Sequence, residues 1–348
     1  MLGIFLLGFA SSTVYEYTGF KKQQTPDFRK NSDSESDSSR PSLEAERAFL
    51  SWMRQYQFTY SGIEYHYRFN LWQSKRNTVN QFNALGESYR LGLNKFSAMT
   101  DSEVGQLCTY TTTEITPKPD PRNGVPKSSV PNSQAFDWRA HGAVLAVRDQ
   151  GSGGSCWCFG SLAAVETKTY LARGRLDYLS TSNLWDCANP GGGNDAALNW
   201  ICNNEGGYHM KESDYPYSET IRYPTCYYDR SKAIETVHNW YRPTTSGDED
   251  AIASALEKDG VVAIGYECAR NFGAYSSGIY YDGDCNHQRN HSMAVVGFGE
   301  GDDRGTWTKY WIVRNSWGGG WGEAGYIRTK RGVGDKCGLA DDVIIPIA

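Results

Sequence analysis

The chain has 348 residues, of which 39% are hydrophobic and 14% aromatic, so it is long enough for two or three folded units with cores of their own. Its formal net charge is −5 and it contains no block of Lys and Arg, which argues against nucleic acid as a partner. Eight of the nine cysteines follow residue 150, and this density indicates disulfides formed in an oxidising compartment.

The N-terminal residues 1–17 are predicted to be a secretory signal peptide. Met1–Ala10 is almost wholly apolar, and the small residues Ser11 and Ser12 follow, as at the cleavage region of such signals; a truncated start would give the same pattern. The apolar run is too short to span a bilayer, and no later stretch reaches 18 apolar residues, so no membrane span is expected after signal removal. Residues 18–42 are predicted to be a flexible, acidic and Ser-rich segment.

Helical periodicity begins at Leu43 and continues to about Asn83, with a break at Ser61-Gly62 that predicts two helices. Residues 111–129 are rich in Thr, Pro and Ser and predict an extended linker open to proteolysis. Further helices are predicted at 156–172, 195–202 and 248–258, and strands at 261–266, 293–298 and 310–314. Helices followed by strands predict an α+β body with two lobes.

A glycine-rich loop at residues 150–155 leads directly into the helix predicted to begin at Cys156. A thiol there lies beside unpaired backbone N–H groups and the positive end of the helix dipole, which favour the thiolate. Cys156 is therefore a candidate nucleophile, and a buried structural thiol is the alternative. Cys156 and Cys158 are not expected to share a metal ion or form a redox pair, because residues two apart point to different sides of a helix. Neither a metal nor a cofactor is expected.

A thiolate nucleophile needs a base and a group that orients the base. His291 stands at the start of one predicted apolar strand, and Asn315 stands at the end of another. Each of them alone would be interpreted as an ordinary strand-end or turn residue.

Together, these segments resemble the papain family of cysteine proteases, specifically cathepsin L-like precursors, over nearly the whole chain. The matching segments are Asp137–Arg139, Gln150–Phe159, Tyr215–Tyr217, Asn290-His291, Asn315–Gly318 and Cys337-Gly338. The resemblance implies a papain-like α+β fold with a helical left lobe and a β-barrel-like right lobe, preceded by an α-helical propeptide domain.

The resemblance also implies roles for individual residues of a cysteine endopeptidase. Cys156 would attack the peptide carbonyl, and His291 would hold its proton and later give it to the leaving amine. Asn315 would orient the imidazole under the shield of Trp317. The side chain of Gln150 and the backbone N–H of Cys156 would stabilise the oxyanion.

The N-terminal domain carries its own resemblance, to the propeptides of cathepsin L-like enzymes. Six residues fall on the helical pattern of these propeptides: Glu64, Arg68, Trp72, Lys75, Val79 and Asn83. Gly92, Asn94 and Phe96 follow the next motif, whereas Ala98 stands where that motif has an aspartate, which argues against an acid-sensing role at this position. The implied division is an inhibitory propeptide at 43–110, a linker with the activation cleavage at 111–129 and a mature peptidase at 130–348.

The cysteine pattern departs from the family. Gly153 replaces a cysteine, and the usual partner of that cysteine is missing as well. The resemblance pairs Cys187 with Cys226 and Cys285 with Cys337. It leaves Cys158, Cys202 and Cys268 unassigned, either as free buried thiols or with a bridge between Cys158 and Cys202.

In the family, the pocket for the second residue on the acyl side of the cut is floored by the position of Asp342. Gly193 and Asn194, which follow the double glycine Gly191-Gly192, would form its wall. A carboxylate floor predicts that Arg or Lys is accepted as well as Leu- or Phe-like residues. The alternative is an Asp342 that faces solvent, since Asp341 lies beside it.

The expected partners are protein or peptide substrates and the chain's own propeptide as an intramolecular inhibitor, and the expected state is a monomer. The resemblance implies the secretory pathway, ending in a lysosome-like acidic compartment or outside the cell. A non-catalytic papain-fold binding or regulatory protein is the alternative function. An unrelated thiol enzyme, such as a transglutaminase or acyltransferase, would not need Asn315–Trp317 or the propeptide pattern.

Overall fold

The computed structural model describes residues 42–112, 115, 131, 133–188, 191–222, 224–244, 247–269, 271–334 and 337–348. The predicted signal peptide, all but the last residue of 18–42 and most of the linker at 111–129 lie outside the described residues. Among the described helices, none has the length and apolar character needed to cross a membrane.

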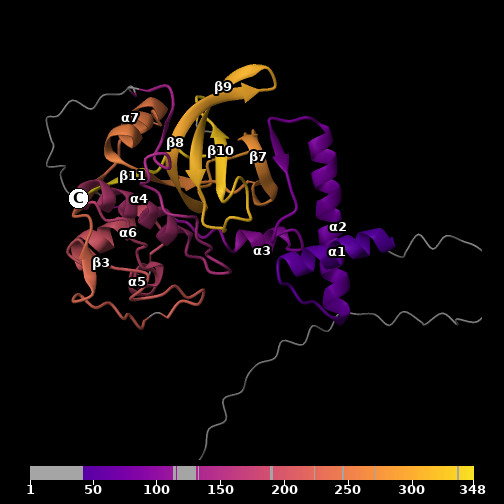
Figure 1. Cartoon of the computed structure of the whole chain (residues 1–348), viewed down its shortest axis with the longest axis horizontal. Coiled ribbons are helices and arrows are strands. Elements are labelled where there is room, and N and C mark those ends of the chain that lie inside the picture. The colour runs from indigo at the N-terminus through magenta and orange to yellow at the C-terminus, as the bar shows by residue number, and fades with distance from the viewer. Residues whose placement is uncertain are drawn as a thin grey trace, which may run out of the picture. The chain divides into compact units, whose positions relative to one another are not determined.

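Two helices that meet across their aromatic faces form the N-terminal domain (Figure 1). They are α1 (Leu43–Gln55) and α2 (Gly62–Ala84), with the predicted break between them, and β1 (Tyr89–Leu91) and α3 (Asp101–Gly105) follow. Phe49 is fully buried between Trp52 of α1 and Phe69 of α2, with ring centroids 5.5 and 5.3 Å from its own. This core explains the three- and four-residue spacing of the aromatic side chains.

Helices build the lobe that follows, around one central buried helix. The elements are α4 (Cys156–Arg173), α5 (Thr181–Cys187), α6 (Asn194–Asn199), the π-helical turn η1 (Trp200–Asn204) and the hairpin of β3 (Tyr208–Met210) with β4 (Ala233–Glu235). Thirteen of the eighteen residues of α4 are buried, which is why its sequence is apolar around most of its circumference.

Strands dominate the second lobe. They are β2 (Phe136–Asp137), β5 (Asn239–Tyr241), β6 (Val262–Tyr266), β7 (Tyr275–Tyr280), β8 (His291–Asp303), β9 (Thr306–Arg314), β10 (Tyr326–Lys330) and β11 (Val343–Ile347), with α7 (Glu249–Asp259) and a 3-10 turn η2 (Phe272–Ala274). The sheet order is β1-β7-β10-β9-β8-β6-β11-β5, and β2 pairs with β8. The predicted two-lobed α+β architecture is confirmed.

The sheet is not closed into a barrel, so the barrel-like right lobe was a wrong expectation. Its two ends are β1, contributed by the N-terminal domain, and β5, and these two strands do not pair in the described part of the chain. Each is only three residues long, and closing a barrel requires a continuous ladder between the edges.

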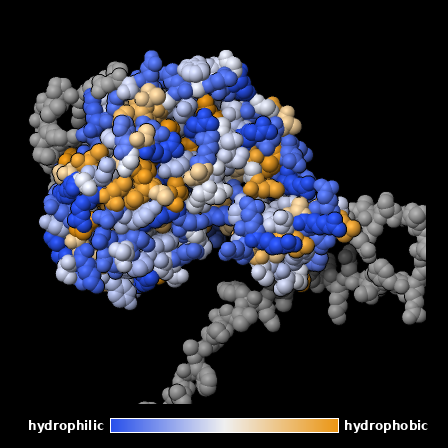
Figure 2. Space-filling view, in the orientation of Figure 1, coloured by the Kyte–Doolittle hydropathy of each residue, from blue (hydrophilic) through white to orange (hydrophobic). Residues whose placement is uncertain are grey.

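The two lobes meet where α4 packs on β8. A Cβ atom on Gly160 of α4 would lie 2.2 Å from Oγ of Ser292 in β8, so this contact requires a glycine. The close approach brings the start of α4 toward the start of β8, and therefore Cys156 toward His291. Figure 2 shows hydrophilic residues over most of the visible face, with hydrophobic residues gathered in patches between them.

Candidate active site

Cys156 is the first residue of α4 and is fully buried. Ser155, the residue before it, makes no side-chain hydrogen bond to the helix terminus, because its hydroxyl is bonded to the Tyr217 hydroxyl at 2.7 Å. The N–H groups of the first turn are therefore not capped by the Ser155 side chain and can favour negative charge at the thiol.

His291 and Asn315 form a buried hydrogen-bonded pair. His291 begins β8, Asn315 directly follows β9, and the distance from His291 Nε2 to Asn315 Oδ1 is 2.8 Å. Asn315 Oδ1 also accepts the backbone N–H of Ser316 at 2.7 Å, so it is an acceptor and Nε2 must carry the hydrogen. The Trp317 ring covers the imidazole with centroids 4.9 Å apart. Because Nε2 is bonded to Asn315, Nδ1 of His291 faces the sulfur atoms of Cys108 and Cys156.

Burial alone would lower the pKa of His291, but the sulfur atoms of Cys108 and Cys156 outweigh it and raise this pKa to about 10. An imidazole that holds its proton beside a sulfur atom is the state needed for an ion pair with a catalytic thiolate. Cys108 belongs to the segment after α3, and no role was predicted for it from the sequence.

Gln150 lies fully buried in the loop before α4. Its Nε2 donates to the Leu107 carbonyl at 3.0 Å and to the Gly153 carbonyl at 2.8 Å, while its Oε1 accepts the Ser316 hydroxyl at 2.6 Å. The bond to Ser316 fixes the amide orientation, so that the N–H₂ end points at a backbone carbonyl of the N-terminal domain.

The segment that contains Leu107 continues along the cleft as an extended chain. Tyr110 N donates to the carbonyl of Asn290 at 2.9 Å, and Thr111 N donates to the carbonyl of Gly192 at 2.8 Å. Gly192 has a φ of 136°, and a Cβ atom there would lie 2.3 Å from Oγ1 of Thr111. A Cβ atom on Gly191 would lie 2.3 Å from the Trp157 ring. The absence of a side chain at Gly192 leaves room for Thr111, and its absence at Gly191 leaves room for Trp157.

Tyr110 is buried beside Asp342. The Tyr110 hydroxyl donates to Oδ2 of Asp342, and Arg242 donates to Oδ1 of the same carboxylate. Burial, and next the charge of Asp342, raise the pKa of Tyr110 well above its usual value. Asp342 is only 1% exposed, whereas Asp341 is the residue that faces outward and bonds His287 at 3.0 Å.

Gly193 and Asn194 make contacts that differ from those of Gly191 and Gly192. Gly193 precedes α6, and its carbonyl accepts the N–H of Ala197 at 3.1 Å. Asn194 directs its Oδ1 away from the cleft, where it accepts the hydroxyls of Ser161 and Ser292 at 3.0 and 2.7 Å. The Asn194 side chain therefore joins α4 to β8. The backbone N–H of Asn194 donates to the Tyr110 hydroxyl.

Two disulfides are formed, Cys187–Cys226 and Cys285–Cys337. Neither Cys158 nor Cys202 is in a disulfide, so the structure contains no bridge between them. At Gly153 a Cβ atom would lie 2.6 Å from the ring of Trp185, which stacks on Tyr217 with centroids 5.9 Å apart. Aromatic rings thus occupy the space that a disulfide at Gly153 would need.

Several residues of the cleft were missed by sequence reasoning: Leu107, Cys108, Tyr110 and Arg242. For Cys108, the sequence offered one signal, which is that it is the one cysteine before residue 150. Within the described residues, one set of side chains could hold a metal ion: Cys108, Cys268 and His291, whose ligand atoms lie within 4.8 Å of one another.

The whole arrangement has counterparts among known proteins. The family model described as papain family cysteine protease matches residues 132–347, and that of the cathepsin propeptide inhibitor domain matches residues 49–104. Cysteine proteinase 5 of Dictyostelium discoideum is 31% identical over 88% of this chain and 93% of its own length. Pro-cathepsin H of Bos taurus is 34% identical over 86% and 89%.

A solved structure shows the same fold. Procathepsin L 3 from the larval midgut of Tenebrio molitor superposes with a TM-score of 0.77 at 32% identity, and the match covers 88% of this chain and all of the other. These matches agree with the geometry of the site. It contains a buried thiol at the start of a helix, a His–Asn pair and an N-terminal domain whose chain enters the cleft. The chain therefore belongs to the papain family of cysteine proteases, as a zymogen that carries the cathepsin-type propeptide inhibitor domain.

Proposed function

We propose that Cys156 is the nucleophile of an endopeptidase, with His291 as its proton acceptor and donor. Attack of the thiolate on a peptide carbonyl would form an acyl-enzyme, and His291 would give its proton to the leaving amine. Asn315 would hold the imidazole through the 2.8 Å bond to Nε2, so that Nδ1 faces the thiol, and Trp317 would exclude water from this bond.

The observation that carries the proposal is the hydrogen bond from Gln150 Nε2 to the carbonyl of Leu107. A preorganised amide donor aimed at a peptide carbonyl beside a buried thiol is what oxyanion stabilisation requires. In the precursor, the donor is occupied by the chain's own backbone. We assign the second donor of the oxyanion site to the backbone N–H of Cys156.

The same contacts support a division of the chain into an inhibitory propeptide at 43–110, a linker at 111–129 that contains the activation cleavage, and a mature enzyme at 130–348. Residues 1–17 are assigned as a signal peptide and 18–42 as a connecting segment. The two disulfides support a route through the secretory pathway to an acidic lysosome-like compartment or out of the cell. A monomeric state is proposed with it.

Substrate preference is proposed to follow from the place that Tyr110 occupies beside Asp342. Bulky side chains such as Leu and Phe would be accepted, and a side chain with a terminal donor would gain a bond to Oδ2 of Asp342. Arg and Lys satisfy this condition, and so does Tyr. Because Arg242 already pairs with Oδ1, an incoming cation gains less charge attraction than it would from an unpaired carboxylate. We therefore expect Tyr to be preferred to Phe by about tenfold in kcat/KM, with Arg accepted.

The decisive experiment measures cleavage of a peptide series that differs only in the second residue before the cut: Tyr, Phe, Arg, Leu or Gly. The acid-treated precursor is compared with Cys156→Ala and with Asp342→Asn. Activity that disappears with Cys156→Ala, together with a Tyr/Phe ratio that falls to about 1 in Asp342→Asn, supports both parts of the proposal. A correctly trimmed and reduced protein that cleaves nothing from acidic to neutral pH would instead be a non-catalytic binding protein.

A further inference from the structure

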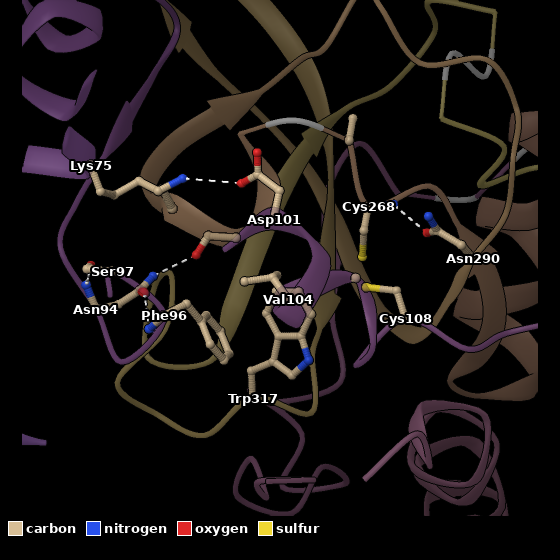
Figure 3. A pocket seen from close by; sticks show the side chains of 14 residues that line it. Lys75, Asn94, Phe96, Ser97, Asp101, Val104, Cys108, Cys268, Asn290 and Trp317 are labelled. Atoms are coloured by element: carbon tan, nitrogen blue, oxygen red, sulfur yellow. Dashed lines mark hydrogen bonds and ion pairs between the residues drawn. The ribbon is translucent and has the colours of Figure 1, made fainter. Parts of the chain in front are cut away.

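Three potential metal ligands from distant parts of the chain meet beside the catalytic pair. Cys108 follows α3 in the propeptide, Cys268 follows β6, and His291 begins β8. The two sulfur atoms and a ring nitrogen lie within 4.8 Å of one another. Figure 3 shows the sulfur atoms of Cys108 and Cys268 turned toward each other across a small gap. Neither cysteine takes part in a disulfide.

The imidazole is oriented to become a ligand when the proton on Nδ1 is released, as metal binding requires. Nε2 of His291 must carry a hydrogen because it donates to Asn315 Oδ1, so in the neutral ring Nδ1 carries a lone pair. Nδ1 is buried and has no hydrogen-bond partner of acceptable geometry within the described residues. A metal-bound histidine usually has its other nitrogen anchored in this way by a carbonyl or carboxylate oxygen.

We propose that the precursor binds one zinc ion through Cys108 Sγ, Cys268 Sγ and His291 Nδ1. Two thiolates and one imidazole are a donor set that zinc prefers, with a water or the Cys156 thiolate as the fourth ligand. Tetrahedral zinc has Zn–S and Zn–N bonds of about 2.3 and 2.0–2.1 Å, which place ligand atoms about 3.6–3.8 Å apart. Shifts of about an ångström or less bring the three atoms to this spacing.

The site is reachable from solvent. A cavity of about 160 Å³ lies between the propeptide and the strand lobe, and Cys108 and Cys268 are among the residues that line it (Figure 3). Asn290 and Trp317, which flank the catalytic pair, line the same cavity. Both cysteines are also partly exposed, so an ion can approach their sulfur atoms while the propeptide remains in place.

Zinc at this point would tie the propeptide to the adjoining ends of β6 and β8 in the strand lobe. The site exists only in the precursor, because removal of the propeptide removes Cys108. The ion would also occupy Nδ1 of His291, the atom that the proposed mechanism uses for proton transfer. This consequence rests on the proposed function, whereas zinc binding itself does not.

The test uses the full-length Cys156→Ala precursor, which cannot process itself. The protein is reduced, stripped with a chelator and titrated with zinc, and bound metal is counted by elemental analysis. One zinc per chain is expected, with an affinity that falls more than about 100-fold in added Cys108→Ser or Cys268→Ser. Cys202→Ser, at a buried cysteine of the helical lobe that is not in a disulfide, is the matched control and should leave the affinity unchanged.

A second measurement on Cys156→Ala alone avoids the risk that a serine variant fails to fold. Zinc should protect Cys108 and Cys268 from a thiol alkylator, as read by peptide mass spectrometry, and leave the labelling of Cys202 unchanged. Equal alkylation with and without zinc would overturn the proposal. So would a precursor that binds no zinc and whose mass shows that Cys108 and Cys268 have lost two hydrogens to a disulfide.

Discussion

The oxygen and the nitrogen of the Gln150 amide make hydrogen bonds with different roles. Oε1 accepts the Ser316 hydroxyl, which fixes the amide plane, and Nε2 points at a carbonyl in the cleft. A donor that is already fixed loses little entropy when charge develops on the carbonyl oxygen. The role of Gln150 therefore depends on Ser316 as well as on its own amide.

Replacement of the donor by a carboxylate oxygen should slow the chemical step. In Gln150→Glu the oxygen that meets Ser316 is kept and the N–H₂ group is lost, so kcat should fall about 100- to 1000-fold, with a much smaller change in KM. Steady-state kinetics of the mature enzyme measure this. Ser316→Ala, which frees the amide but keeps its donor, should lose no more than about tenfold. Equal losses in the two variants would contradict the oxyanion role.

Between elements, one ion-pair cluster joins the long helix α2 to α3. Arg68 of α2 donates to both carboxylate oxygens of Glu103 in α3, at 2.7 and 2.6 Å, and to the carbonyl of Ala98 at 2.9 Å. Hydrogen bonds from Arg68 outweigh burial and lower the pKa of Glu103 to about 2. Ala98 cannot titrate, whereas the pair of Arg68 and Glu103 is an acid-sensitive contact in this part of the propeptide.

A carboxylate with a depressed pKa stabilises the fold fully above its ordinary pKa of about 4.3 and loses this contribution as pH falls toward 2. Glu103→Gln in the Cys156→Ala precursor should therefore cost about 1–2 kcal/mol at pH 7. The difference from the unchanged precursor should shrink between pH 4.5 and 2.

Thermal unfolding at several pH values tests this. Glu64→Gln serves as the control, since Glu64 also bonds Arg68 from α2 but is half exposed, and it should have a smaller effect. A Glu103→Gln difference that stays constant down to pH 2 would rule the pair out as an acid-sensitive contact.

Some elements were predictable because their own sequence carries the pattern. The helices α1, α2, α4 and α7 and the strands β6, β8 and β9 were all expected close to their observed places. The short helix α5 was not, since all seven of its residues are buried and no amphipathic period remains. β1 was missed because a strand of three residues exists here only through its pairing with β7.

At the scale of the molecule, the propeptide adds a strand to the sheet of the enzyme. β1 pairs antiparallel with β7, Gly92 N donates to the Ala274 carbonyl at 2.8 Å, and Asn94 Nδ2 donates to the Gly273 carbonyl at 2.7 Å. Backbone pairing of this kind gives affinity without much side-chain specificity. The docking therefore depends on how closely the two backbones can approach.

Gly92→Val tests this docking. A Cβ atom at Gly92 would lie 2.9 Å from Cβ of Ser276, so a larger side chain should push β1 from β7. We expect conversion of the precursor at acidic pH to accelerate about tenfold, with unchanged kcat/KM of the mature enzyme, which lacks Gly92. Gly105→Ala is the matched control, because no atom lies within 4 Å of its Cβ position. Equal conversion rates would mean that the strand pairing does not limit release.

Only some residues of the candidate site could be predicted from the sequence. Cys156, His291, Asn315 and Gln150 stand in recognisable local sequences. Tyr110 and Arg242 do not, because their meeting at Asp342 joins positions far apart in the chain and leaves no local pattern. The same is true of Cys108, whose neighbours in space come from β6 and β8.

The aromatic packing at Gly153 has a consequence for the redox chemistry of the enzyme. Thiol-dependent catalysis works only where reductants keep Cys156 reduced, and the same reductants attack strained or exposed disulfides. Here the loop before Cys156, the proposed nucleophile, is held by Trp185 and Tyr217, and none of its described contacts is a disulfide. Strong reductants would therefore reduce the proposed nucleophile without breaking a covalent link of the loop that carries it.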